Sequence, residues 1–304
     1  MTDMNRRDFL KIGATAGVAM GLGIPSLLKA ASTYDLAVVT GKAEDAVNKA
    51  VKLLGGWSAF ISSGEKVLIK PNISFPQDPS VGATTSPEVI AAVVKGCLSA
   101  GASKIIIADY PLRSPEACFQ KSKIEQITAL SNKVMAFPST RQSMYEEYEV
   151  KNGKSLKSVE MLKMYNKCER MILVPTAKSH SASGVSFTLK GNMGLIWNRH
   201  TFHRDLDLSQ AIADLYSIIN VTLVIMDATR ALMTGGPGGP GQLKKLDTII
   251  AGTDPIAVDS YTTSLVPWYG KSLTGANVPH IYKAYQFGYG KIDTRKMNIA
   301  KSTA

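Results

Sequence analysis

The chain has few of the residues that build the commonest cofactor sites. It has three cysteines, Cys97, Cys118 and Cys168, and no CxxC pair among its 304 residues. Because iron–sulfur clusters and four-cysteine zinc sites need closely spaced cysteines, the sequence argues against a cysteine-ligated cluster. Buried thiols are the simplest state of the three, and one disulfide stays open. No GxGxxG motif follows the first apolar run, which leaves a dinucleotide site without support.

The positive charge of the chain is spread out rather than gathered. The sequence carries 35 Lys and Arg against 24 Asp and Glu, a formal net charge of +11, and aromatic residues make up only 7% of it. Nucleic-acid binders concentrate basic residues and interleave them with aromatic ones, so we expect no nucleic-acid partner. The charge instead predicts a small anionic ligand or substrate, or simply a basic surface.

The N-terminus has the pattern of an export signal. Arg6 and Arg7 precede an apolar, glycine- and alanine-rich run over residues 12–28, and small residues follow at 30–32. The run contains four glycines and Pro25, and its length lies at the lower limit for a membrane span. We therefore predict a twin-arginine signal peptide over residues 1–31, with a retained N-terminal anchor as the alternative to cleavage.

This signal fixes several further expectations. The chain should meet the twin-arginine translocation machinery and be periplasmic or otherwise extracytoplasmic, with no stable membrane span after cleavage. Because residues 1–31 hold four basic and two acidic residues, the rest keeps a net charge of about +9. Residues 32–304 are long enough to form a single domain with a large core.

Apolar runs alternate with helical patterns along residues 32–304. The sequence predicts strands at 36–39, 67–69, 104–108, 171–174, 222–226 and 248–251, and helices at 44–54, 87–100, 212–219 and 255–265. Such an alternation is typical of an α/β fold, here a mostly parallel sheet with helices on both faces. We predict one α/β domain over 32–304, with a small polar insertion at 139–167. The active-site loops should follow the carboxyl ends of the strands.

Polar side chains follow several of these strands. If the carboxyl ends share one edge of the sheet, that edge gathers a set of ionisable and amide side chains. Each member alone is more simply explained as a structural residue, because loops are exposed to water and polar residues follow strands in most proteins. The set contains Lys70, Asn72, Asp109, Lys178, His180, Asp227, Asp254 and Asp259.

Three of the four histidines fall within residues 178–203, together with Lys178, Lys190 and Asn192. Histidine is the side chain that most often binds metals or moves protons near neutral pH. We predict that His180 acts as an acid/base catalyst, with Lys178 and Lys190 positioning an anionic substrate. Further substrate-binding candidates, chosen for their hydrogen-bond donors, are Lys70, Asn72, Asn192 and Arg204.

A metal is the second chemistry that this stretch suggests. His200 and His203 would share one face of a helix and could chelate a transition metal, with Asp227 completing the site. Asp205 is an alternative third partner. The other interpretation is that these histidines are exposed on a basic loop, and His280 is expected to be structural.

A glycine–proline run over residues 235–241 has three interpretations. Its backbone N–H groups could cradle an anion, it could form a lid, or it could be a plain loop. It lacks the Lys-Ser/Thr pair of a nucleotide-binding P-loop.

Six segments together resemble a known family, the domain of unknown function 362. They are 67–72 (VLIKPN), 85–89 (TSPEV), 105–109, 174–180 (VPTAKSH), 189–194 (LKGNMG) and 252–259 (GTDPIAVD). The resemblance covers most of residues 35–290 and implies a fold and a site region, because the family has no settled reaction. Some members add ferredoxin-type modules, for which this chain lacks the cysteines.

A second, shorter pattern is similar to the site of the lactate racemase family. His180 stands ten residues before Lys190, and histidines follow downstream. The resemblance implies a nickel pincer nucleotide attached to Lys190, with His180 as proton-transfer base and His200 or His203 as metal ligand. The glycine-rich flank of that lysine is absent here, and the downstream spacing differs.

The sequence therefore predicts an exported enzyme that depends on a metal or a lysine-linked cofactor and acts on a small anionic substrate. The alternative is a non-catalytic periplasmic protein that binds or carries an anionic ligand or a metal complex.

Overall fold

The apolar strands assemble into one central sheet. A computed structural model describes residues 32–304, so the predicted signal at 1–31 lies outside the described residues. Strand β11 runs antiparallel to both of its neighbours, and the other adjacent pairs along the sheet are parallel. The predicted mostly parallel α/β fold is confirmed. The strand order is β12 (Ile299–Thr303), β1 (Leu36–Thr40), β11 (Leu243–Gly252), β10 (Leu223–Leu232), β7 (Arg170–Val174), β2 (Lys66–Pro71), β3 (Lys104–Asp109) and β4 (Val134–Pro138).

Both faces of this sheet are buried. Successive side chains of a strand point to opposite faces, and β1 shows the result: Leu36 and Val38 belong to one hydrophobic core, Ala37 and Val39 to the other. In β2, Leu68 faces the first core while its neighbours face the second. This double burial explains why the strands read as near-continuous apolar runs.

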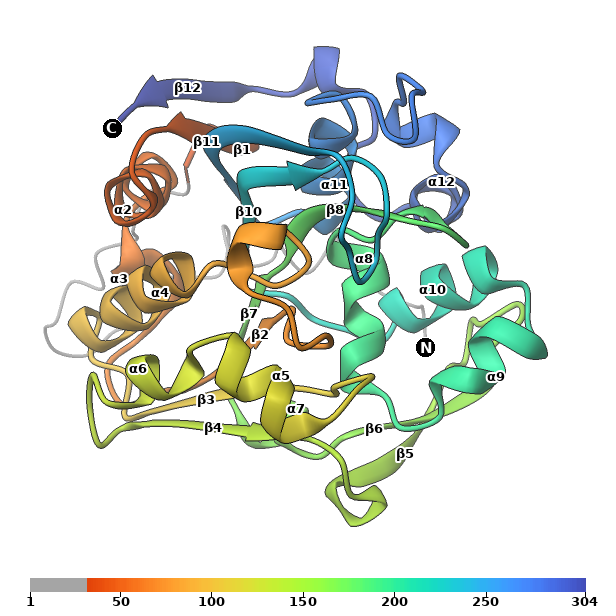
Figure 1. Cartoon of the computed structure of the whole chain (residues 1–304), viewed down its shortest axis with the longest axis horizontal. Coiled ribbons are helices and arrows are strands. Elements are labelled where there is room, and N and C mark those ends of the chain that lie inside the picture. The colour runs from red at the N-terminus through yellow and green to blue at the C-terminus, as the bar shows by residue number, and fades with distance from the viewer. Residues whose placement is uncertain (1–31) are drawn as a thin grey trace, which may run out of the picture. The chain divides into compact units, whose positions relative to one another are not determined.

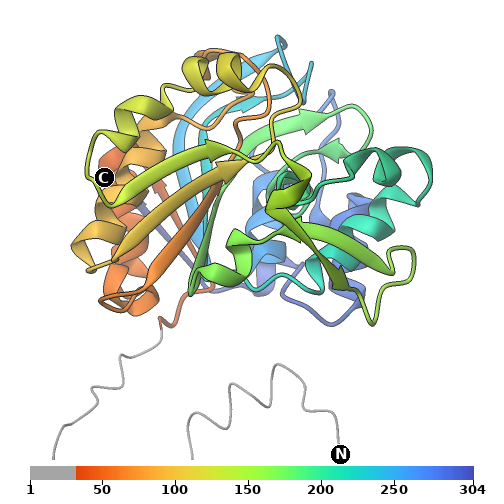
Figure 2. The same cartoon turned by 90° about the horizontal axis from the view of Figure 1, so that it is seen from below.

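Helices form a layer on each side of the sheet (Figures 1 and 2). One layer consists of α2 (Ala43–Leu53), α3 (Trp57–Phe60), α4 (Pro87–Ser99), α5 (Pro115–Lys121) and α6 (Ile124–Thr128). The other contains α8 (Thr188–Gly191), α9 (Arg199–Arg204), α10 (Leu208–Tyr216), α11 (Pro255–Thr263) and α12 (Pro279–Gln286). Short 3-10 helices are η1 (Pro79–Val81), η3 (Asn192–Leu195), η4 (Gly275–Asn277) and η5 (Thr294–Lys296). Every helix within residues 32–304 is too short or too polar to span a membrane.

Two strands extend well beyond their predicted ends. Strands β10 and β11 continue as a long antiparallel hairpin, whose connecting loop contains the glycine–proline run. Strand β7 ends at Val174, and after Pro175 the chain forms β8 (Thr176–His180), which pairs with the outer half of β10. A two-residue strand, β9 (Gly184–Val185), pairs with β8. Strand β8 therefore carries its lysine and histidine beyond the carboxyl end of β7.

The segment at 139–167 forms a small unit of its own secondary structure. It contains η2 (Gln142–Met144), a two-stranded antiparallel sheet of β5 (Tyr145–Glu149) and β6 (Ser158–Leu162), and α7 (Met164–Lys167). Tyr145 and Leu162 join the same hydrophobic core as α8 and α10. The hairpin thus packs beside the helices that carry the candidate site.

Candidate active site

The carboxyl ends of the parallel strands border a pocket of about 130 Å³. That volume is close to a cavity that holds benzene, so it suits a small molecule. Aromatic walls come from Phe75, Tyr110 and Trp197. The residues that line this pocket, all within the described range, include no Asp or Glu. They do include seven basic or imidazole side chains: Lys70, Lys178, Lys190, Arg199, His180, His200 and His203.

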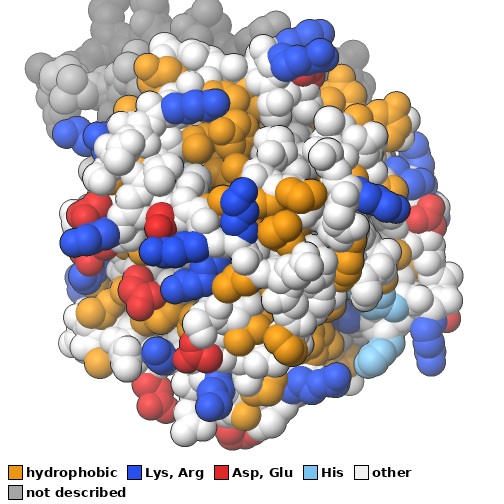
Figure 3. Space-filling model, turned by 45° about the horizontal axis from the view of Figure 1, so that its top comes forward, with side chains coloured by type: hydrophobic (Ala, Val, Ile, Leu, Met, Phe, Trp, Pro, Cys, Tyr) orange, Lys and Arg blue, Asp and Glu red, His pale blue; other side chains and the backbone are white. Residues whose placement is uncertain are grey.

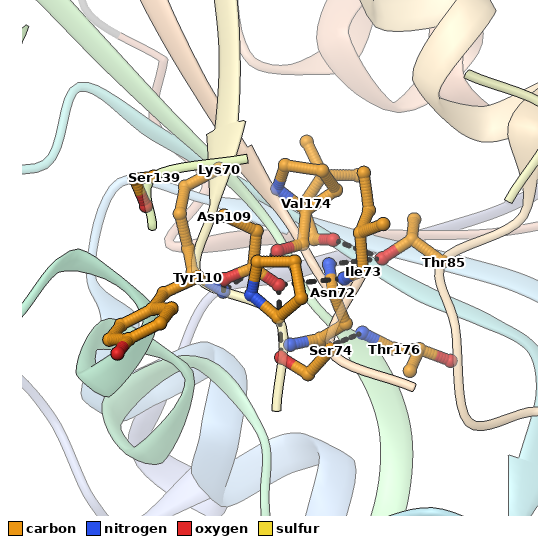
Figure 4. A network of polar contacts seen from close by, with 12 residues as sticks. Lys70, Asn72, Ile73, Ser74, Thr85, Asp109, Tyr110, Ser139, Val174 and Thr176 are labelled. Carbon is orange, nitrogen blue, oxygen red and sulfur yellow. Dashed lines mark hydrogen bonds and ion pairs between the residues drawn. The ribbon is translucent and has the colours of Figure 1, made fainter. Parts of the chain in front are cut away.

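Lys70, which lines the pocket, forms a buried ion pair with Asp109 (Figure 4). The Lys70 ammonium lies 3.1 Å from Oδ1 of Asp109 and donates to the Pro71 carbonyl oxygen at 2.7 Å. The other oxygen of Asp109 accepts from the Ile73 N–H and the Ser74 hydroxyl. Both charged side chains are at most 3% exposed. Burial lowers the pKa of Lys70 although Asp109 opposes the shift, and the pair has little charge left for a ligand.

Asn72 connects two strand ends and still faces the pocket. Its Oδ1 accepts from the Thr176 N–H at 2.9 Å, and its backbone N–H donates to the hydroxyl oxygen of Thr85 at 2.8 Å. That hydroxyl in turn donates to the Val174 carbonyl (Figure 4). Since Oδ1 is occupied and no described residue accepts from Nδ2, the Nδ2 group of Asn72 can donate to a ligand.

Two buried lysines have an unusual protonation equilibrium. Burial, together with Lys70 and Lys190, lowers the pKa of Lys178 to about 7. Burial, Arg199 and Lys70 lower the pKa of Lys190 to about 7 as well. Lys178 donates to the Ala83 carbonyl at 2.6 Å and lies over the ring of Phe75. Near neutral pH both groups therefore exchange between a cation and a neutral amine.

His180 is held in one tautomer. Its Nδ1 accepts from the Ala182 N–H at 3.1 Å, which assigns the ring proton to Nε2. Burial, Lys190 and His203 lower the pKa of His180 to about 2, so the ring stays neutral. The ring of His203 stacks on it with centroids 6.1 Å apart. His180 can thus donate a hydrogen bond through Nε2 without carrying a charge.

Arg199 and an aromatic stack are site features that the sequence analysis missed. The Arg199 guanidinium lies 3.9 Å above the Tyr110 ring and donates to the carbonyls of Tyr110 and Pro111. The ring of Trp197 also stacks on Tyr110, with ring centroids 5.4 Å apart. A guanidinium has five N–H groups, so Arg199 keeps donors for a ligand. The spacing Arg199–His203 is one helical turn, a signal that could have linked them.

Asp259 positions the short helix that carries Lys190. One carboxylate oxygen of Asp259 accepts from the Thr188 N–H and the other from the Leu189 N–H, both at 2.9 Å. These are the first amides of α8, which have no partner within the helix. Burial raises the pKa of Asp259 to about 7 against the opposing effect of these bonds. The contacts describe a positioning role for this residue.

Three predicted site residues lie outside the pocket lining. Asn192 is fully buried on η3, and neither its Oδ1 nor its Nδ2 has a partner among the described residues. Arg204 points to solvent beside Asp205. Asp227 lies within β10, where its carboxylate accepts from the Ser86 and Thr229 amides and the Thr229 hydroxyl. These carboxylate contacts hold the start of α4 against the sheet.

The predicted metal ligands do not come together. His200 and His203 both line the pocket, but Asp227 does not, and its oxygens are occupied by hydrogen bonds. No group of three His, Cys, Asp or Glu residues in the described part of the chain could hold a metal ion. His180 does not replace the missing ligand, because its free nitrogen carries the proton. The side chains present therefore do not fit a three-ligand metal site.

The glycine–proline loop forms part of the pocket wall. Pro237 lines the cavity, and the Gly236 N–H donates to the hydroxyl oxygen of Ser179 on β8 at 3.1 Å. The hydroxyl of Tyr269 donates to the Gly236 carbonyl. A Cβ at Gly236 would lie 1.9 Å from the Ser179 carbonyl oxygen, so the loop packs closely on β8. This packing favours a fixed wall over a lid.

The histidines mark where the pocket meets solvent. His200 and His203 are exposed, whereas His180 is only 7% exposed. In Figure 3 the histidine side chains visible on that face form one small group with basic side chains beside it. The deeper pocket is thus entered past imidazole and ammonium groups, an arrangement that attracts anions.

The fold and the pocket describe an α/β protein with a basic cavity at its strand ends. Residues 67–264 match the family model described as a domain of unknown function (DUF362), and the chain belongs to this family. Residues 3–23 match the signal sequence of the twin-arginine translocation pathway, which indicates export to the periplasm or extracytoplasmic space. The predicted family and the predicted twin-arginine export signal are both confirmed.

Two individual proteins are similar to this chain. The thylakoid-associated protein sll1697 of Synechocystis sp. (strain ATCC 27184 / PCC 6803 / Kazusa) is 22% identical over 222 residues, which cover 70% of this chain and 66% of that protein. The lactate racemase apoprotein from Thermoanaerobacterium thermosaccharolyticum superimposes with a TM-score of 0.42 at 15% identity, over 64% of this chain and 50% of that one. The chain thus spans just under two thirds of the first protein and half of the second.

Proposed function

We propose that this chain is an exported enzyme that acts on a small anionic substrate held in the basic pocket. The observation that carries the proposal is the grouping of Lys178, Lys190 and Arg199 around a cavity without an acidic lining residue. Burying a charge without a partner costs several kcal/mol. An anion in the cavity would supply the missing partner, which gives a physical reason for the arrangement.

Two further features favour an enzyme over a carrier. A lysine with a pKa of about 7 can give or take a proton at neutral pH, and Lys178 and Lys190 both have this property. The neutral His180 offers an Nε2–H donor that could polarise a substrate carbonyl. We propose that the lysines move the proton and that His180 stabilises the developing oxyanion. A carrier would need the positive charges but not these proton equilibria.

A more specific version of this proposal adds a metal or a lysine-linked cofactor. Lys190 would be the lysine for covalent attachment, and His200 with His203 would be the imidazoles at the pocket entrance. Because the ligand set for a metal is incomplete, the proposed proton chemistry uses only the lysines and His180.

The Lys190→Met variant is expected to bind anions at least tenfold more weakly while being more stable by roughly 1–3 kcal/mol. Methionine fills a similar volume and removes a buried, unpaired ammonium. Calorimetric titration with oxalate or sulfate measures the first effect, and urea unfolding at neutral pH measures the second. Lys151→Met, at an exposed position, is the control. Unchanged anion binding in Lys190→Met would contradict the proposal.

The His180→Gln variant separates the enzyme from the carrier. If His180 stabilises an oxyanion, turnover should fall by about 10²–10⁴ while affinity changes much less. Conversion of small carboxylates and phosphates, followed by proton NMR with the wild-type protein, first identifies a substrate; the variant is then compared on it. If the wild type binds these anions and converts none, the carrier interpretation replaces the enzyme.

A further inference from the structure

The three pocket lysines differ in what their ammonium groups contact. The Lys70 nitrogen is paired with Asp109 and bonded to the Pro71 carbonyl. The Lys178 nitrogen is bonded to the Ala83 carbonyl. The Lys190 nitrogen has neither a hydrogen bond nor an ion pair with any described residue, although its side chain is only 8% exposed and lines the pocket. Lys190 is therefore the lysine that is free to react with a ligand.

We propose that Lys190 forms an imine with the carbonyl group of a small 2-oxo acid whose carboxylate is bound by Arg199. This inference rests on the proposed function and deepens it, since it names a substrate class and a covalent step for the same pocket. The geometry that supports it is an unpartnered primary amine in a small cavity, with a guanidinium and an imidazole donor lining the same space.

Formation of the imine needs only the Lys190 amine and the 2-oxo acid, and it releases one water molecule. The lone pair of the neutral Lys190 amine attacks the carbonyl carbon and forms a C–N bond, and a proton passes from nitrogen to the carbonyl oxygen. The resulting carbinolamine then loses its hydroxyl group and the second N–H proton as water, which leaves a C=N bond. The Nε2–H group of His180 donates to the carbonyl oxygen during the attack.

Burial, assisted by the neighbouring cations, explains why this lysine is available as a nucleophile. Burial, Arg199 and Lys70 lower the pKa of Lys190 to about 7, so about half of it is neutral amine at pH 7. An ordinary lysine is neutral in only about one molecule in 3,000 at that pH. The same cations attract the substrate carboxylate to the pocket.

The cavity limits the substrate to a short chain. At about 130 Å³ it admits a molecule about the size of benzene. The aromatic faces of Tyr110 and Trp197 provide an apolar wall, so a 2-oxo acid of a few carbons suits the space. A larger substrate would extend past the exposed His200 and His203.

Borohydride trapping tests this inference. The mature protein is incubated with glyoxylate, reduced with sodium borohydride, and mapped by peptide mass spectrometry. We expect a stoichiometric reduced adduct on Lys190, at least tenfold above any exposed lysine, and at least tenfold less with uncharged methyl glyoxylate. The Lys190→Arg variant keeps a cation but should give no adduct, whereas Lys151→Arg should label like the wild type.

The outcomes separate this inference from the proposed function. Glyoxylate that binds, as seen by calorimetry, but leaves no adduct on Lys190 would overturn the imine and leave the anion site intact. Adducts spread evenly over surface lysines, or labelling that survives in Lys190→Arg, would overturn it as well. If neither glyoxylate nor oxalate binds at all, the anion pocket itself is wrong and the imine fails with it.

Discussion

Replacing Asp109 with alanine is expected to destabilise the folded protein by about 3–5 kcal/mol. The substitution leaves the Lys70 ammonium buried with only the Pro71 carbonyl as a partner. It also removes the acceptor of the Ile73 N–H and the Ser74 hydroxyl. Urea unfolding of the purified mature protein measures the loss. The effect should be large because both ends of the pair are buried.

The double variant Lys70→Met/Asp109→Ala provides the matched comparison. Removing both charges avoids the uncompensated ammonium, so the double variant should be more stable than Asp109→Ala alone. The backbone amide of Ile73 still loses its acceptor, so recovery should be partial. A cost below about 1 kcal/mol for Asp109→Ala would show that water reaches Lys70, and that the pair is not buried as described.

Raising the pH from about 7 to about 8.5 is expected to increase the free energy of unfolding by roughly 2–3 kcal/mol. Lys178 and Lys190 have a pKa of about 7 in the folded protein, against 10.5 for an ordinary lysine. In this window the unfolded chain holds protons that the folded chain has released. Stability therefore rises with pH, by up to about 1.4 kcal/mol per unit for each lysine. Urea unfolding across the window measures the slope.

The pKa shifts of His180, Asp259 and the thiols fall largely outside that window. Folding lowers the pKa of His180 from its ordinary value of 6.5 to about 2, and it raises the pKa of Asp259 from 3.8 to about 7. The thiols, whose pKa values burial raises, affect stability only at higher pH. The Lys178→Met/Lys190→Met double variant should thus lose most of the slope. An equal slope in the double variant would assign the pH dependence to other groups.

The sequence predicted the part of the pocket that depends on strand ends. Lys70 lies near the carboxyl end of β2 and Asn72 follows it, while Lys178 and His180 come after the end of β7. These two strands are neighbours in the sheet, so their ends meet. Near-continuous apolar runs were sufficient to recognise the doubly covered sheet. Lys190 was found through its sequence neighbourhood, and the contacts of Asp259 explain why it reaches the pocket.

Asp227 and Arg204 lie away from the pocket lining, because local geometry decides the direction of each side chain. Asp227 was expected to follow a strand, but β10 continues to Leu232, and the carboxylate stays within the sheet. Within α9, Arg199 and His203 line the pocket whereas Arg204 does not, because consecutive residues of a helix point about 100° apart. The four-residue spacing that links Arg199 to His203 also links Arg204 to His200, so the position of the helix was needed to tell the two arginines apart.

Proton uptake during anion binding tests the central claim most directly. Oxalate is titrated into the mature protein at about pH 7.5, in two buffers with different heats of ionisation. If a bound anion keeps both Lys178 and Lys190 protonated, binding should take up roughly one to two protons at this pH, because the pKa of each lysine lies near 7 in its absence. The observed heat should then depend on the buffer, and the Lys178→Met/Lys190→Met variant should lose both binding and uptake. Oxalate that fails to bind, or that binds the double variant as tightly as the wild type, would contradict the basic pocket as an anion site.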